Sequence, residues 1–305
     1  MPDGLQTKPK RRPKLLATAP ELIKARKPKI LAYGASGVGK TSFAIDFPDV
    51  YFIDVEGGAT QPEYRERLKA ANGMYLGPDD GAASFQVVME QVQALATQEH
   101  DRRTLVIDSM TKLFANEIAR EAERLHDEGK RNEFGADKKP AVNYMRQLVS
   151  WLTRMNLNVI LICGEIPEWG KDSQGERAQI GSTFDCWPRL EYELDLAIQV
   201  VKLGDRRFGR VRKSRIAAFP HAATFDWTYD EFTKLYGRDV VEEASSPVAC
   251  ATPEQIEELN RLLEVVKLEE GTTDKWLAAA NVSTWDEMAQ DKLEKCIEHL
   301  RSKLQ

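Results

Sequence analysis

Residues 34–41 read Gly-Ala-Ser-Gly-Val-Gly-Lys-Thr, which fits the pattern G-x-x-x-x-G-K-[ST] of a phosphate-binding loop. The run before it, Lys29-Ile-Leu-Ala-Tyr33, is apolar and typical of a buried strand, and Ser42-Phe-Ala-Ile after it is typical of a helix. The glycines let the backbone curl so that its N–H groups face a phosphate at the start of a helix. The motif and its context therefore predict a nucleotide-binding α/β fold.

The residues of this loop have distinct predicted roles in binding ATP. Lys40 is expected to bridge the β- and γ-phosphates, and Thr41 to ligate Mg²⁺. A second apolar run, Thr104-Leu-Val-Ile-Asp108, is interpreted as the Walker B strand that brings Asp108 to the phosphates as a second Mg²⁺ ligand. The predicted ATP- and Mg²⁺-binding residues are Gly34, Ala35, Ser36, Gly37, Val38, Gly39, Lys40, Thr41, Ser42 and Asp108.

Charge is distributed unevenly along the 305 residues, although the formal net charge is only -5. Residues 1–30 carry nine Lys and Arg against two acids, and residues 202–215 carry seven against one. Residues 252–305 carry twelve acids against seven bases. The total charge does not indicate nucleic-acid binding, but the local basic segments permit it.

Cysteine and histidine give no sign of a metal centre. The four cysteines contain no C-x-x-C pair, which favours reduced thiols in a cytoplasmic compartment over disulfides or a zinc site. The four histidines have no partner at metal or catalytic-triad spacing. No apolar run approaches the roughly 20 residues of a membrane span, so no membrane partner is expected.

The pattern of the sequence divides the chain into four parts. We predict a basic flexible tail over residues 1–27, a core over 28–240, a linker over 241–251 and an acidic helical module over 252–305. In the core, the strands expected after the first are 50–54, 104–108 and 158–163, followed by an antiparallel extension of 194–202, 209–216 and 222–227. Helices are expected at 84–97 and around 113–125 and 142–152, with long loops at 127–140 and 166–181. The fold class is thus α/β, a mostly parallel sheet with helices on both faces, plus a small C-terminal helical module.

The residue that activates water is predicted to be Glu56. AAA+ and ABC-type ATPases place a Glu directly after the Walker B Asp, but here Ser109 follows Asp108. Glu56 comes after the strand Val50–Asp54, and a strand next to the phosphate-loop strand aims a carboxylate at the γ-phosphate. The alternative is that Glu56 is a solvated acid in a turn.

Residues 28–230 resemble the RecA-like recombinase core, an AAA-type P-loop ATPase fold. Phe52-Ile-Asp-Val-Glu56 is similar to the strand that ends in that family's catalytic Glu, and Val106-Ile-Asp-Ser109 is similar to its Walker B strand. Ile160–Ile166 resembles the strand that leads into the second DNA-binding loop. The nearest resemblance is to phage-encoded minimal RecA-core ATPases linked to single-strand annealing.

The segment Val211–Ala218 resembles the Lys-Asn-Lys segment of that family. The resemblance implies that Lys213 and Arg215 reach the γ-phosphate of a neighbouring subunit in a ring or filament. The alternatives are a solvated strand face, or DNA backbone contact together with the other cations of the same hairpin. The sequence departs from the family at Glu165, where the family has a sensor Gln, and residues 1–27 show no recombinase N-terminal arm.

The two long loops combine cations with aromatic residues, as single-stranded DNA sites do. The alternative is an ordinary surface loop, and the resemblance favours DNA. The candidate DNA-binding residues are Lys130, Arg131, Phe134, Lys138 and Lys139 in the first loop, and Trp169, Lys171 and Arg177 in the second.

The predicted function is a Mg²⁺-dependent ATPase that binds single-stranded DNA and promotes phage DNA recombination or annealing in the cytoplasm of a bacterial host. Its predicted partners are further copies of the chain and a single-stranded-DNA-binding protein recruited by the C-terminal module. Two alternatives remain: a helicase-like or loader motor, and a nucleotide-dependent interaction switch with little turnover.

Overall fold

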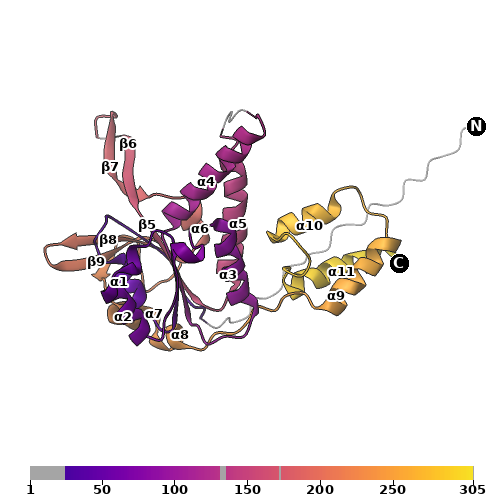
Figure 1. Ribbon diagram of the computed structural model, residues 1–305, viewed down its shortest axis with the longest axis horizontal. Helices are drawn as coiled ribbons and strands as arrows, with labels where there is room; N and C mark the ends of the chain where they lie inside the picture. The colour runs from indigo at the N-terminus through magenta and orange to yellow at the C-terminus, as the bar shows by residue number, and fades with distance from the viewer. Residues whose placement is uncertain (1–24, 131–134, 172, 305) are drawn as a thin grey trace, which may run out of the picture.

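The computed structural model describes residues 25–130, 135–171 and 173–304 (Figure 1). Its core is an eight-stranded sheet in the order β10-β9-β8-β1-β5-β4-β2-β3, and β6 and β7 form a separate two-stranded sheet. The strands are β1 (Lys29–Tyr33), β2 (Val50–Asp54), β3 (Met74–Leu76), β4 (Thr104–Asp108), β5 (Asn158–Cys163), β6 (Glu165–Lys171), β7 (Arg177–Phe184), β8 (Leu196–Leu203), β9 (Arg206–Ser214) and β10 (Thr224–Asp226).

Six neighbouring strands of the large sheet, from β8 through β1 to β3, run parallel. Their central members are buried along almost their whole length, because helices cover both faces. This confirms the predicted fold class. One detail of the prediction is wrong: β8 is parallel to β1, so the antiparallel extension begins at β9 and not at residue 194.

Side chains alternate between the two faces of the sheet, as the two-residue period of a strand requires. Leu31, Tyr33 and Ile107 pack in one core cluster, whereas Ile30 and Val106 pack in the other. Helices α3, α4 and α5 lie on one face and α1, α2 and α7 on the other (Figure 1). The helices of the core are α1 (Lys40–Ile45), α2 (Pro62–Ala70), α3 (Phe85–Thr97), α4 (Met110–Asp127), α5 (Lys138–Arg154), α6 (Leu190–Glu193), α7 (Tyr229–Tyr236) and α8 (Arg238–Glu242).

The segment predicted as a long loop over residues 166–181 is instead the antiparallel hairpin β6–β7. It projects from the core beyond the end of β5 (Figure 1). Both faces of the hairpin are largely open to solvent, and Trp169 and Ile180 are more than half exposed. A strand without a buried face lacks the apolar alternation that marks a strand in a sequence, which explains the error.

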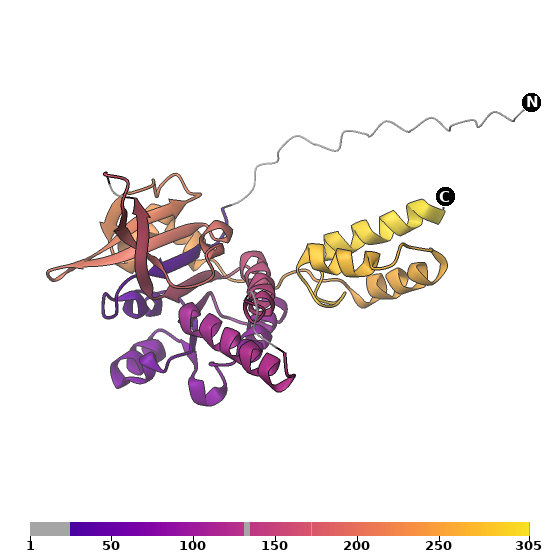
Figure 2. The same ribbon diagram turned by 90° about the horizontal axis from the view of Figure 1, so that it is seen from above.

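The C-terminal helices are α9 (Pro253–Val265), α10 (Thr272–Ala280) and α11 (Gln290–Leu304), and they lie together at one end of the molecule (Figure 2). They enclose a hydrophobic core cluster of their own. Thr252 caps α9 in a capping box with Gln255. The module touches the α/β core: the Glu287 carboxylate accepts a hydrogen bond from Gln93 in α3 at 2.6 Å, and the Glu287 carbonyl accepts one from Arg154 in α5 at 3.2 Å. None of the described helices is long and apolar enough to cross a membrane.

The end of the predicted N-terminal tail belongs to the folded core. Residues 1–24 lie outside the described residues, but Lys27 is buried and its ammonium donates hydrogen bonds to the carbonyls of Val241 and Glu243. In the predicted linker, the Val248 amide donates to the Ala96 carbonyl at 2.7 Å. These contacts bring both segments against the core.

Lys29 is a buried cation whose removal should change how stability depends on pH. Its ammonium donates to the carbonyl of Met155 at 2.8 Å and to that of Leu157, and burial lowers its pKa to about 7. Above that pH the folded chain binds fewer protons than the unfolded chain, so this group makes stability rise with pH until the unfolded lysine also titrates. We expect wild type to gain up to about 1.4 kcal/mol per pH unit relative to Lys29→Met between about pH 7 and 9. Urea unfolding of both proteins across this range tests the prediction, and a pH-independent difference would contradict it.

Candidate nucleotide-binding site

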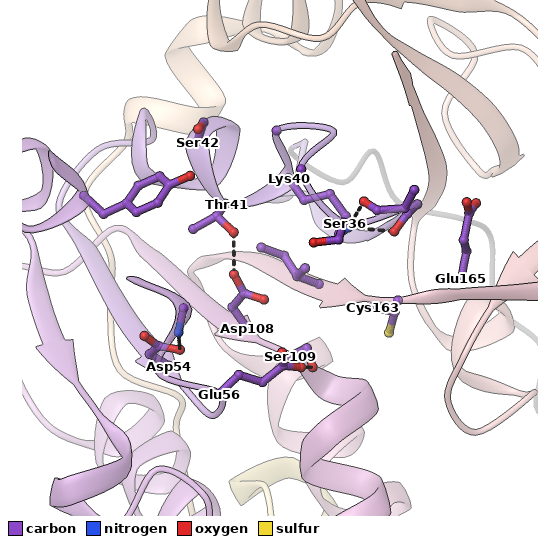
Figure 3. A pocket seen from close by; sticks show the side chains of 18 of the residues that line it. Ser36, Lys40, Thr41, Ser42, Asp54, Glu56, Asp108, Ser109, Cys163 and Glu165 are labelled. Atoms are coloured by element: carbon purple, nitrogen blue, oxygen red, sulfur yellow. Dashed lines mark hydrogen bonds between the residues drawn. The ribbon is translucent and has the colours of Figure 1, made fainter. Parts of the chain in front are cut away.

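A cavity of about 570 Å³ opens at the carboxyl ends of β1, β2, β4 and β5, the edge where open α/β sheets bind ligands (Figure 3). The phosphate loop forms one wall. Besides loop residues, the lining includes Asp54, Glu56, Asp108, Ser109, Cys163, Glu165 and Arg207.

The loop has the backbone that its glycines predict. Gly37 and Gly39 have φ angles of 77° and 95°, in the left-handed region that glycine adopts freely. The Lys40 ammonium donates to the carbonyls of Gly34 at 2.7 Å and Ala35 at 2.8 Å, and its burial lowers its pKa. The structure therefore brings the predicted phosphate-binding lysine and the loop together in one cavity.

The two predicted Mg²⁺ ligands contact each other. The Thr41 hydroxyl donates to the Asp108 carboxylate at 2.7 Å (Figure 3). Burial raises the pKa of Asp108 to about 6, while the hydrogen bond from Thr41 acts in the opposite direction. A buried carboxylate beside a hydroxyl, facing a phosphate cavity, is a fit for Mg²⁺, which uses few protein ligands when substrate phosphates supply others. No cluster of three or more acidic, His or Cys side chains that could hold a metal occurs among the described residues.

Glu56 lines the cavity, but its strand is not where we expected it. β2 lies between β4 and β3, so β5 and β4 separate it from the phosphate-loop strand. Glu56 still reaches the site because the chain after β2 is hydrogen-bonded to the end of β4. The Val55 amide donates to the Asp108 carbonyl at 2.7 Å. The Ser109 hydroxyl, which also caps α4, donates to the Glu56 carboxylate (Figure 3). The side chain is therefore held at the cavity.

Asp54, which the sequence analysis did not single out, organises the loop that carries Glu56. Its buried carboxylate accepts the amides of Gly57 at 2.8 Å, Gly58 at 3.1 Å and Ala59 at 2.8 Å. It also accepts the Tyr75 hydroxyl at 2.8 Å. Burial, and then the bond to Asp54, raise the pKa of Tyr75, so its hydroxyl remains a donor at neutral pH. Four donors thus fix one carboxylate beside the candidate base.

Glu165 also faces the cavity, on the side of the loop lysine. The Ser182 hydroxyl donates to its carboxylate at 2.9 Å, and Gln199 donates to Ser182 at 2.8 Å. The Glu165 carboxylate is therefore held by a short polar chain between the hairpin and β8.

The predicted trans-acting cations lie away from the cavity of their own chain. The Lys213 ammonium donates to the Leu194 carbonyl, and Arg215 donates to the carbonyls of Glu193 at 3.2 Å and Tyr192. Burial lowers the pKa of Lys213. Both side chains reach the same segment, but neither lines the cavity.

The candidate DNA-binding residues fall on two separate projections. Lys138 and Lys139 begin α5, and Lys130 pairs with Glu128 at 2.6 Å, whereas Arg131 and Phe134 lie outside the described residues. On the hairpin, the Arg177 guanidinium lies 5.3 Å from the centre of the Trp169 ring, and Lys171 is exposed. The α4–α5 projection follows β4 and the hairpin follows β5 (Figure 1). Residues at the carboxyl ends of both strands line the cavity.

The comparison with known protein families agrees with this site. Residues 26–218 match the family described as AAA domain. The chain belongs to this AAA domain family. Because it also carries a phosphate loop, the chain is in general terms a P-loop nucleotide-binding ATPase.

Individual relatives add little. No protein with a curated description matches the chain. Among solved structures, the chain is similar to one titled "Crystal structure of the RadB recombinase", with 20% sequence identity and a TM-score of 0.42. The similarity covers 66% of this chain and 86% of that one.

Proposed function

We propose that this AAA-domain ATPase binds single-stranded DNA and promotes recombination or strand annealing of phage DNA in the cytoplasm of a bacterial host. The observation that carries the proposal is the exposed Trp169 ring beside the Arg177 guanidinium, on a hairpin that leaves the edge of the nucleotide cavity. A ring stacks on bases and nearby cations follow the phosphate backbone, the combination that single-stranded DNA sites use. ATP binding near one end of the hairpin would thus be coupled to DNA binding at the other end.

Hydrolysis in this proposal relies on groups that the cavity brings together. The Glu56 carboxylate orients the attacking water and accepts its proton. Lys40 moves from its loop carbonyls to the β- and γ-phosphates, where its charge stabilises the leaving group. Thr41 and Asp108 would hold Mg²⁺, which neutralises charge on the phosphates when it is bound.

The assembly would be a ring or filament of identical subunits. Lys213 and Arg215 of one subunit would then leave the carbonyls of residues 192–194 and contact the γ-phosphate of the neighbour, the role of an arginine finger. The acidic C-terminal module would recruit a single-stranded-DNA-binding protein.

A second candidate function is a nucleotide-dependent interaction switch with little turnover. Glu165 favours it, because a carboxylate on the wall of the cavity repels the triphosphate and opposes the charge that hydrolysis develops. Hydrolysis that DNA does not stimulate would support this alternative.

The test measures ATP hydrolysis against the concentration of single-stranded DNA, for wild type and Trp169→Ala. We expect DNA to stimulate wild type, and the half-stimulating concentration to rise about tenfold in the variant, because stacking contributes about 1–3 kcal/mol per base. Ile180→Ala is the matched control, since it removes an equally exposed side chain of the same hairpin that has no ring. An absence of stimulation in wild type, or an equal effect of both substitutions, would contradict the proposal.

A further inference from the structure

One arginine that no predicted role uses lies at the phosphate loop of its own chain. Arg207, near the start of β9, lines the nucleotide cavity. Its side chain passes so close to Gly39 that a Cβ at this glycine would come within 2.8 Å of the arginine Cδ and 2.9 Å of its Nε. A side chain at residue 39 would require the arginine to move, and the φ angle of 95° already favours glycine at this position.

The strand that carries Arg207 is fixed to the loop by Trp227. The Trp227 amide donates to the Arg207 carbonyl at 2.9 Å, and its indole N–H donates to the Gly39 carbonyl at 3.3 Å. The indole also stacks on Phe43 of α1, with 3.8 Å between ring centres. Arg207 is thus held beside the loop by the fold of one subunit, without help from another.

The Arg207 guanidinium has no anionic partner among the described residues, unlike Arg206 and Arg212 of the same strand. Arg206 pairs with Asp226 at 2.8 Å, and Arg212 pairs with Glu168 at 2.5 Å. A guanidinium that faces a phosphate cavity and lacks a carboxylate is suited to bind an anion there, because charge-assisted bonds to phosphate are strong.

We propose that Arg207 binds the phosphate chain of the nucleotide in its own subunit. The assignment rests on the proposed use of this cavity for a nucleotide, but not on hydrolysis or DNA binding. Because the Arg207 side chain lies beside Gly39 of the loop, whose backbone cradles the α- and β-phosphates, it is assigned to these two groups and not to the γ-phosphate. ADP and ATP share these groups, so Arg207 supports the binding of both.

The first test measures the affinity of the full chain for ADP and for ATP by calorimetry. We expect Arg207→Ala to weaken both affinities about tenfold or more, as the loss of a charged hydrogen bond does. Arg207→Lys should lose less affinity for both nucleotides, because it keeps the positive charge. Arg206→Ala, which removes the neighbouring arginine paired with Asp226, should bind as wild type does.

Three outcomes separate the alternatives. If Lys40→Ala does not weaken binding, the cavity is not the nucleotide site and the proposed function fails. If Lys40→Ala weakens nucleotide binding but Arg207→Ala has the same affinity for nucleotide as Arg206→Ala, the inference about Arg207 is overturned. A loss for ATP without a loss for ADP would overturn the assignment to the shared phosphates.

A mixing experiment tests whether Arg207 acts within its own subunit. Lys40→Ala subunits retain Arg207 but have a defective loop, so in a mixture they could supply the arginine only to a neighbour. We expect the sites of Arg207→Ala subunits to keep their weakened affinity when Lys40→Ala subunits are added in excess. Recovery of wild-type affinity in the mixture would show that the arginine acts across an interface and would overturn the proposal.

Discussion

Glu56→Gln is expected to lower the rate of ATP hydrolysis by about 10²-fold or more, while the affinity for ATP stays near that of wild type. The substitution removes the proton-accepting carboxylate of this side chain and keeps its shape. The Gln carboxamide oxygen still accepts the Ser109 hydroxyl that holds Glu56 at the cavity. Phosphate binding depends on Lys40 and the loop, which Glu56 does not contact through any hydrogen bond described here. Steady-state hydrolysis and ATP calorimetry on the same preparation measure the two effects.

Glu63→Gln is the matched control for this prediction. Glu63 lies exposed in the first turn of α2, a few residues further along the chain, and undergoes the same change of charge. We expect it to leave hydrolysis unchanged. Turnover by Glu56→Gln close to that of Glu63→Gln would exclude Glu56 as the base.

The central strands could be predicted from sequence because they are buried on both faces. Lys29–Tyr33, Val50–Asp54, Thr104–Asp108 and Asn158–Cys163 all occur with the expected bounds. A parallel strand in the middle of a sheet is an uninterrupted apolar run, and such runs leave little freedom in where the strand begins and ends. The proximity of Thr41 and Asp108 has the same origin, since Asp108 ends one such strand and Thr41 lies just after the loop that follows another.

The order of the strands and the roles of individual polar residues could not be predicted in this way. Nothing local in Val50–Asp54 shows that two strands separate it from β1. Asp54 reads as an ordinary acid at a strand end, and Arg207 as one of several cations in a basic hairpin. Their roles arise from contacts with Tyr75 and Gly39, which are distant in the chain and come together only in the folded structure.

Asp54→Ala should impair both stability and catalysis, because one carboxylate shapes the loop that carries Glu56. The substitution leaves the amides of residues 57–59 and the Tyr75 hydroxyl without their acceptor. Unsatisfied buried donors cost about 1–3 kcal/mol each, and part of this cost is relieved by water, so we expect a loss of about 3 kcal/mol or more in unfolding free energy. Urea unfolding measures it.

The catalytic effect of Asp54→Ala should appear in turnover and not in nucleotide affinity. A displacement of about 1 Å in a positioned group costs about 10²-fold in rate. The phosphate loop is carried by β1 and α1, which Asp54 does not touch through any of its described hydrogen bonds, so ADP affinity is expected to stay within a few-fold of wild type. Equal losses of turnover and ADP affinity would contradict this assignment and would indicate general unfolding of the site.

Tyr75→Phe and Asp54→Asn test the same prediction with smaller changes to the hydrogen bonds of Asp54. Tyr75→Phe removes one of four hydrogen bonds and should cost about 1 kcal/mol, with a small effect on turnover. Asp54→Asn keeps one acceptor oxygen but turns an NH₂ group toward donors, whichever way the amide is oriented, because each carboxylate oxygen accepts two hydrogen bonds. We therefore expect turnover to be highest in Tyr75→Phe, lower in Asp54→Asn and lowest in Asp54→Ala. This order follows the number of donors left without an acceptor, since the position of Glu56 depends on the loop that those donors fix.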